Sequence, residues 1–207
     1  RFQTVFDRIV APDPGPGLLA QAHLDSLTKP QGSLGRLEEL ARRLVEIRGE
    51  ERLAVESAVI FTLAGDHGVV AEGVSAYPQV VTTQMVENFL RGGAAVNVLA
   101  RHAGARVVVA DLGVAQSIPA HPELRAKKVA PGTQNFARGP AMTRAQALEA
   151  IEAGIDLVEA EASLDLIGTG EMGIGNTTSA SAITAGITGA PVESVTGRGT
   201  GIDDAGW

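Results

Sequence analysis

Residues 164–180 read LDLIGTGEMGIGNTTSA, and this stretch indicates the fold more clearly than any other. Its first five residues are typical of a short buried strand. Gly168, Gly170 and Gly173 follow in the spacing G-x-G-x-x-G, and small residues over 177–187 then favour a helix. A strand that runs through glycines into a helix predicts one unit of an α/β protein.

Similar units recur along the rest of the chain. Short apolar runs predict strands at 57–64, 105–112, 164–168 and 192–196. Helical periodicity predicts helices at 18–27, 33–48, 78–103 (broken at Gly92-Gly93), 143–162 and 177–187, whereas 118–139 looks irregular. Strands that alternate with helices predict a doubly wound, mostly parallel sheet flanked by helices. We expect residues 1–52 to form a smaller helical subdomain and 53–207 an α/β nucleotide-binding domain.

Composition excludes several classes of function. Of the 207 residues, 25 are glycine and none is cysteine, and the formal net charge is −7. Because nucleic-acid-binding surfaces are rich in Lys and Arg, this acidic chain is predicted not to bind nucleic acid. The lack of cysteine excludes disulfides, thiolate catalysis and thiolate metal sites. Since no apolar run reaches the roughly 20 residues of a membrane span, we expect a cytoplasmic protein that does not enter a membrane.

The predicted strands end in glycines or acidic residues. The segments are GDHG at 65–68, DLG at 111–113, GTGEMGIG at 168–175 and GRGTG at 197–201. Parallel sheets bind ligands beyond the carboxyl ends of their strands, so these segments predict a shared crevice, although such glycines also simply make tight turns. The loop before the helix at 177–187 favours a phosphate, because helix N-termini offer N–H donors and partial positive charge.

Individual residues at these strand ends have alternative interpretations. The charge of Glu171 would oppose a pyrophosphate, which weakens the dinucleotide interpretation of the glycines. The same carboxylate suits chemistry beside a nucleotide, as a general base or a partner for positive charge, or it is an exposed loop glutamate. Arg198 is either a second phosphate contact or a surface residue. We expect Asp66 to orient a substrate rather than bind a metal, since no metal-ligand spacing is recognised.

Four long segments together resemble one enzyme family. They are KPQGSLGRLEELA (29–41), AGDHGVVAEGVSAYPQVVTTQMVENFLRGGAAVNVLA (64–100), GTGEMGIGNTTSA (168–180) and TGRGTGIDD (196–204). The sequence resembles the nicotinate-nucleotide–dimethylbenzimidazole phosphoribosyltransferases, which assemble the lower ligand of cobalamin. The resemblance implies transfer of the phosphoribosyl group of nicotinate mononucleotide to 5,6-dimethylbenzimidazole, giving α-ribazole 5′-phosphate and nicotinate. It further implies inversion at the ribosyl carbon, no metal or organic cofactor, and a homodimer.

The same resemblance implies roles for particular residues. Glu171 is expected to support catalysis. The nucleotide and its phosphate are expected to bind to Gly173, Ile174, Gly175, Asn176, Thr177, Thr178, Gly197, Arg198 and Gly199. The benzimidazole is expected near Tyr77, Gln84, Met85 and Met172, with Tyr77 either stacking on the base or packing at a helix start. Because family members are considerably longer, we expect this sequence to be truncated and the principal general base to lie beyond Trp207.

Two other functions stay open at this point. The glycines at 168–173 allow a dinucleotide-dependent oxidoreductase, which dinucleotide binding would reveal. A non-catalytic azole-binding fragment would bind benzimidazole without forming a product.

Overall fold

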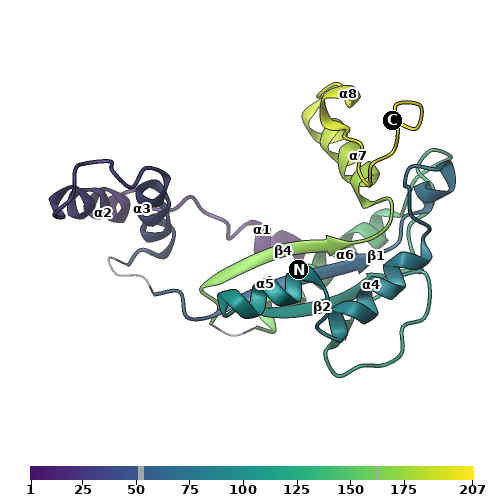
Figure 1. Ribbon diagram of the computed structural model, residues 1–207, viewed down its shortest axis with the longest axis horizontal. Coiled ribbons are helices and arrows are strands. Elements are labelled where there is room, and N and C mark those ends of the chain that lie inside the picture. The colour runs from purple at the N-terminus through teal and green to yellow at the C-terminus, as the bar shows by residue number, and fades with distance from the viewer. Residues whose placement is uncertain (51–53, 162) are drawn as a thin grey trace. The chain divides into compact units, whose positions relative to one another are not determined.

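A computed structural model describes residues 1–50, 54–161 and 163–207 (Figure 1). The chain divides into two compact units, residues 1–56 and 57–207. The domain boundary predicted between residues 52 and 53 lies outside the described residues, and so does Ala162, the predicted end of a helix. The helices within the described ranges are all too short or too polar to cross a bilayer.

The first unit is helical. Its elements are α1 (Phe2–Phe6), α2 (Gly15–Ser26) and α3 (Arg36–Arg48), and α2 packs on α3. In the first turn of α3, the buried carboxylate of Glu38 accepts hydrogen bonds from Lys29 Nζ at 2.7 Å and from the Leu34 backbone N–H at 3.1 Å. The hydrogen bond from Lys29 holds the pKa of Glu38 below its ordinary value. One carboxylate therefore fixes the turn KPQGSLG.

The second unit contains a four-stranded parallel sheet with the strand order β3-β2-β1-β4. The strands are β1 (Ala58–Gly65), β2 (Arg106–Gly113), β3 (Leu124–Ala126) and β4 (Leu166–Met172). The first, second and fourth of these confirm the strands predicted at 57–64, 105–112 and 164–168. Because every pair is parallel, all four carboxyl ends lie at one edge of the sheet, where the sequence predicts the site.

Two features of this sheet correct the sequence prediction. The strand predicted at 192–196 is wrong, because Val192–Val195 forms the short helix α8 directly after Pro191. A run of five residues is too short for its apolar pattern to distinguish the two structures. The fourth strand is instead β3, within the stretch predicted to be irregular, where only three residues pair with β2.

Helices cover both faces of the sheet. The remaining elements are the 3-10 helix η1 (Gly68–Glu72), α4 (Val80–Leu90), α5 (Ala95–Ala103), α6 (Arg144–Glu159) and α7 (Asn176–Thr188). On one face Val86 and Phe89 of α4 pack against Val109, and on the other Leu157 of α6 packs against Phe61. Figure 1 shows α4 and α5 in front of the strands and α6 behind them. The doubly wound α/β fold is therefore confirmed.

Candidate active site

The strand ends bring three acidic residues to one edge of the sheet. In β1, Ala64 pairs with Asp111 of β2 on one side and with Met172 of β4 on the other. Asp66 follows β1 directly, and Glu171 is the penultimate residue of β4. The sequence-predicted clustering of these strand ends is thus found in the structure. Within the described ranges, however, no three His, Asp or Glu side chains are placed to share a metal ion.

Asp66 is buried, with 2% of its surface exposed, and connects two loops. Its Oδ2 accepts a hydrogen bond from the Ala115 N–H at 2.7 Å, and its carbonyl oxygen accepts one from the Thr133 N–H at 3.0 Å. Its Oδ1 has no hydrogen-bond partner among the described residues. Asp66, His67 and Thr133 also border a cavity of about 160 Å³. Asp66 therefore fixes the loops around the edge, and its role toward a substrate stays a prediction.

His67 connects the end of β1 to α7. Its Nδ1 lies 2.9 Å from Oγ of Ser179 in the first turns of α7. Burial lowers the pKa of the imidazole, while the negative charges of Asp66 and Glu171 act in the opposite direction. The net shift favours the neutral ring at neutral pH.

Glu171 lies at the end of β4, which corrects its predicted place within a loop. It pairs in the sheet with Leu63, and its exposed carboxylate accepts a hydrogen bond from the Asn176 side-chain amide. The Asn176 Oδ1 in turn accepts one from the Thr177 backbone N–H at 2.8 Å. A rigid strand thus holds a solvent-accessible carboxylate beside the first turn of α7. Such a group can take a proton from a ligand that binds over that turn.

The glycine motif does not form a dinucleotide loop. Gly168 and Gly170 lie inside β4, where they pair with Ile60 and Thr62 of β1. A Cβ at Gly168 would lie 3.2 Å from Cγ1 of Ile60, so a glycine fits closely between the strands. Because only the last glycine of G-x-G-x-x-G leaves the strand, the backbone cannot wrap a pyrophosphate as that fingerprint requires. This geometry does not support the dinucleotide interpretation.

The connection from β4 to α7 is short and buried. Gly173, Ile174 and Gly175 are all buried, and the Ile174 N–H donates to Oγ1 of Thr82 at 3.1 Å. Gly175 is the residue before α7 and has φ of +88°, and a Cβ there would lie 2.7 Å from Cγ2 of Val70. Only glycine meets both conditions without strain. These three residues directly precede α7, and their close packing fixes the direction in which the helix leaves the sheet.

A cavity of about 110 Å³ lies between the first turns of α7 and the segment after α8. It is lined by Thr177, Thr178, Gly197, Arg198 and Gly199, all predicted to contact the nucleotide. The backbones approach closely, because a Cβ at Gly199 would lie 2.9 Å from Oγ1 of Thr177. The Arg198 guanidinium donates to the Ile202 carbonyl oxygen and pairs with Asp204. Of the other predicted nucleotide contacts, Asn176 donates a hydrogen bond to Glu171, and residues 173–175 form the buried connection before α7.

The segment predicted to hold the benzimidazole reaches the same region. Thr200 Oγ1 accepts a hydrogen bond from the Ala76 N–H at 2.9 Å and lies 3.2 Å from Oγ of Ser75. Tyr77 is the next residue in the chain and is 56% exposed. The hydroxyl of Thr200 therefore joins the GRGTG loop to the segment that is predicted to bind the base.

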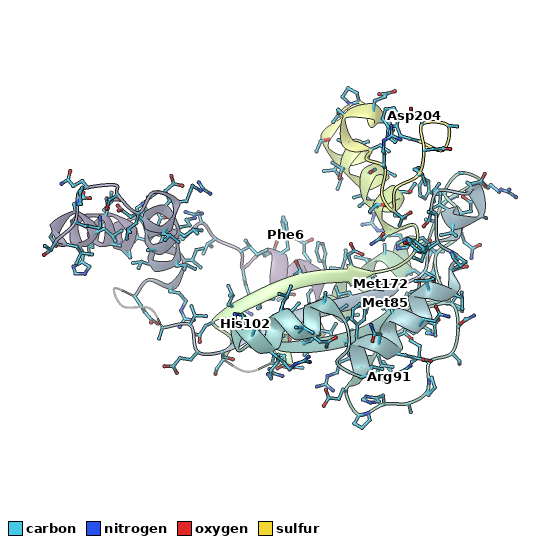
Figure 2. All side chains as sticks on the ribbon, in the orientation of Figure 1. Phe6, Met85, Arg91, His102, Met172 and Asp204 are labelled. Carbon is cyan, nitrogen blue, oxygen red and sulfur yellow. The ribbon has the colours of Figure 1, made fainter. Side chains whose placement is uncertain are left out.

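The other three residues predicted for the base differ in exposure. Gln84 of α4 is exposed. Met85 of α4 and Met172 of β4 are partly buried and pack against the core cluster that contains Val86 and Phe89. Figure 2 labels both methionines at the same end of the sheet. Part of each side chain is thus committed to the core, and contact with a base remains a prediction for all three.

Sequence reasoning missed three polar residues that organise this edge. Thr82 and Ser179 are hydroxyl residues within helices, and Thr133 lies in a stretch predicted to be irregular. Their hydrogen-bond partners, Ile174, His67 and Asp66, lie 92, 112 and 67 residues away in the chain, respectively. A local pattern carries no signal for such contacts, since the partners meet only in the folded sheet.

The sequence of this chain is similar to that of known proteins. A family model described as phosphoribosyltransferase matches residues 9–207. The nicotinate-nucleotide–dimethylbenzimidazole phosphoribosyltransferase of Geobacter sulfurreducens is 61% identical over 187 residues, covering 89% of this chain and 53% of that protein. The protein of the same name from a Roseiflexus species is 54% identical over 201 residues, covering 96% of this chain and 57% of that protein.

A solved structure agrees with these relatives. The crystal structure of CobT from Thermus thermophilus superposes with a TM-score of 0.88 at 50% sequence identity. The match covers 92% of this chain and 58% of that chain. This chain therefore spans a little more than half the length of the relatives it matches.

Proposed function

This chain belongs to the phosphoribosyltransferase family whose model matches residues 9–207, and on that premise we propose that its protein transfers the phosphoribosyl group of nicotinate mononucleotide to 5,6-dimethylbenzimidazole. The products are α-ribazole 5′-phosphate and nicotinate, in cobalamin biosynthesis. The names of the Geobacter and Roseiflexus relatives support this pair of substrates. A homodimer and a cytoplasmic location are parts of the same proposal.

The observation that carries this proposal is the cavity between α7 and the GRGTG loop. One wall is the N-terminal turn of a 13-residue helix with the hydroxyls of Thr177 and Thr178, and the other holds the guanidinium of Arg198. Helix N-termini and arginine both favour phosphate, for electrostatic reasons and because they offer N–H donors. Glu171 lies at the end of the strand that precedes this helix, and its carboxylate contacts the side chain of Asn176 in the first turn.

The proposed mechanism is a single displacement at the ribosyl carbon. With the phosphate held at α7, a nitrogen of the benzimidazole attacks C1 of the ribose, and the bond to the nicotinate nitrogen breaks with its electron pair. The pyridinium charge of the donor is lost, and the other ring nitrogen of the acceptor gives up its proton. Glu171 supports this step by pairing with the positive charge that develops or by accepting the proton. Positioning of the two rings supplies much of the rate increase.

Incubation of the full-length protein with both substrates tests the proposal. The expected product has the mass of α-ribazole 5′-phosphate and appears only when both substrates are present. Purified, folded protein that forms no such product with any benzimidazole would contradict the proposal. Light scattering and cell fractionation test the homodimer and the cytoplasmic location.

A further inference from the structure

Helix α7 carries the turn that lines the 110 Å³ cavity, yet none of its own residues is buried. Its two isoleucines, Ile183 and Ile187, are 61% and 80% exposed. Apolar packing normally fixes the position of a helix on a sheet. In the described residues, α7 contacts α8, where Ser181 Oγ donates to the Val195 carbonyl oxygen at 2.9 Å, and its first turn is tied to the sheet by polar contacts at its N-terminal end.

His67 makes the contact that joins this turn to the centre of the sheet. Its backbone follows β1, which is paired on both sides, and its Nδ1 lies 2.9 Å from Oγ of Ser179. The buried glycines Gly173 and Gly175 lie close to this histidine. A Cβ at Gly173 would lie 3.0 Å from Nε2 of His67, and a Cβ at Gly175 would lie 3.4 Å from its Cβ. The imidazole is thus enclosed between the β4–α7 connection and the helix.

We propose that His67 is a positioning residue, which fixes the N-terminal turn of α7 for phosphate binding through its hydrogen bond to Ser179. The inference rests on the proposed function, because it takes the ligand of that turn to be the phosphate of a nucleotide. It also gives Gly173 a second role, because a side chain there would crowd the imidazole as well as the carbonyl oxygen of Gly65. His67 itself does not need to touch the substrate.

The electrostatics around His67 agree with a neutral, hydrogen-bonding ring. Burial lowers its pKa, and the two charged groups that act on it, Asp66 after β1 and Glu171 on β4, oppose this without reversing it. Ser179 of α7 presents a hydroxyl, which can donate to or accept from the neutral ring. A protonated ring would add positive charge beside the positive end of α7, which is unfavourable for the helix.

Three substitutions in the full-length protein test the proposal. H67L and S179A each remove the hydrogen bond, whereas H67N keeps a polar group close to the position of Nδ1. S117A changes an exposed serine in the loop after β2 and is the matched control. Binding of nicotinate mononucleotide and, separately, of ribose 5-phosphate is measured by calorimetry. The KM values of both substrates and kcat are measured in parallel, and thermal melts show that each variant is folded.

We expect H67L and S179A each to weaken binding of both phosphate ligands about tenfold, with the KM for the benzimidazole unchanged. The double variant should be no weaker than either single one, because both remove one interaction. H67N should restore most of the affinity, and S117A should behave like the wild type. Additive losses, equal losses for both substrates, or no loss would overturn the proposal. If the wild type binds ribose 5-phosphate but makes no product, the proposed function fails while the positioning role is still tested by binding.

Discussion

The hydroxyl of Thr82 on α4 lies 3.1 Å from the backbone nitrogen of Ile174 and accepts its hydrogen bond in a buried setting. The two residues are 92 positions apart in the chain. Thr82 is fully buried and Ile174 is 6% exposed, so solvent cannot replace the bond. This contact holds the β4–α7 connection against α4. The connection leads into the N-terminal turn of α7, where we propose that the phosphate binds.

Replacement of Thr82 by valine should therefore destabilise the protein. The change keeps the shape but leaves the buried Ile174 N–H without an acceptor, which costs about 1–3 kcal/mol. The neighbouring Thr83 is a matched control, because it is also buried and its Oγ1 has no partner among the described residues. T83V should be neutral or slightly stabilising. Urea unfolding measures both, and equal losses for T82V and T83V would contradict this account.

Gly175 should not tolerate alanine. Its φ of +88° is unfavourable for any residue with a Cβ, and the new atom would meet Cγ2 of Val70 at 2.7 Å. The strain and the overlap together should cost about 2 kcal/mol or more of unfolding free energy. Gly186, in the middle of α7, has open space around it, so G186A should stabilise by up to about 1 kcal/mol. Thermal melts that rank G175A as equal to or more stable than G186A would refute the prediction.

Glu171→Gln should reduce turnover and leave nucleotide binding intact. The amide keeps the size of the side chain but removes the charge and the ability to take a proton, so we expect kcat to fall about 100-fold. The KM for nicotinate mononucleotide should stay within a factor of two to three. E193Q changes an exposed glutamate on α8 and serves as the control. Unchanged kcat in steady-state assays of E171Q would exclude the supporting role.

Arg198→Ala should weaken binding of the nucleotide. Loss of one charge-assisted contact to phosphate should raise the Kd of nicotinate mononucleotide about tenfold, and added salt should reduce the difference. Arg91, the residue directly after α4, is an exposed arginine that pairs with Glu87. R91A is therefore the matched control. Calorimetry at two salt concentrations measures both. An affinity loss in R91A as large as that in R198A would point to net charge instead of a site contact.

The stability of the protein should respond to protonation of His67. Because burial lowers the folded-state pKa of this group below its unfolded value near 6.5, the unfolded chain binds its proton first. The contribution of His67 is thus complete above about pH 6.5 and is lost as the pH falls through the lower, folded-state pKa. Wild type should lose more stability than H67N between pH 8 and pH 5. Parallel losses in urea unfolding would show that His67 is not responsible.

Much of this architecture follows from local sequence patterns. Aliphatic runs such as SAVIFTLA correctly predict β1 and β2, the two inner strands of the sheet. Thr143 and Gln146 form the expected capping box at the start of α6. The patterns fail where elements are very short. Three residues of β3 and four of α8 carry too little periodicity, and their structure depends on the neighbours they pack against.

In the candidate site, too, the sequence predicts some features correctly and misses others. Parallel topology alone brings Asp66 and Glu171 to one edge, so the sequence predicts this clustering correctly. The glycine motif is misleading in isolation, because Gly168 and Gly170 satisfy the packing of β4 against Ile60 and leave no loop. The hydrogen bond between His67 and Ser179 spans 112 residues and has no counterpart in any local pattern.

The release of nicotinate from nicotinate mononucleotide, with and without 5,6-dimethylbenzimidazole, tests the proposed transfer most directly. If the full-length protein moves a phosphoribosyl group between two bases, nicotinate should appear only when the acceptor is present, in equal amount to α-ribazole 5′-phosphate. Release at the same rate without the acceptor, or no release with it, would contradict the account.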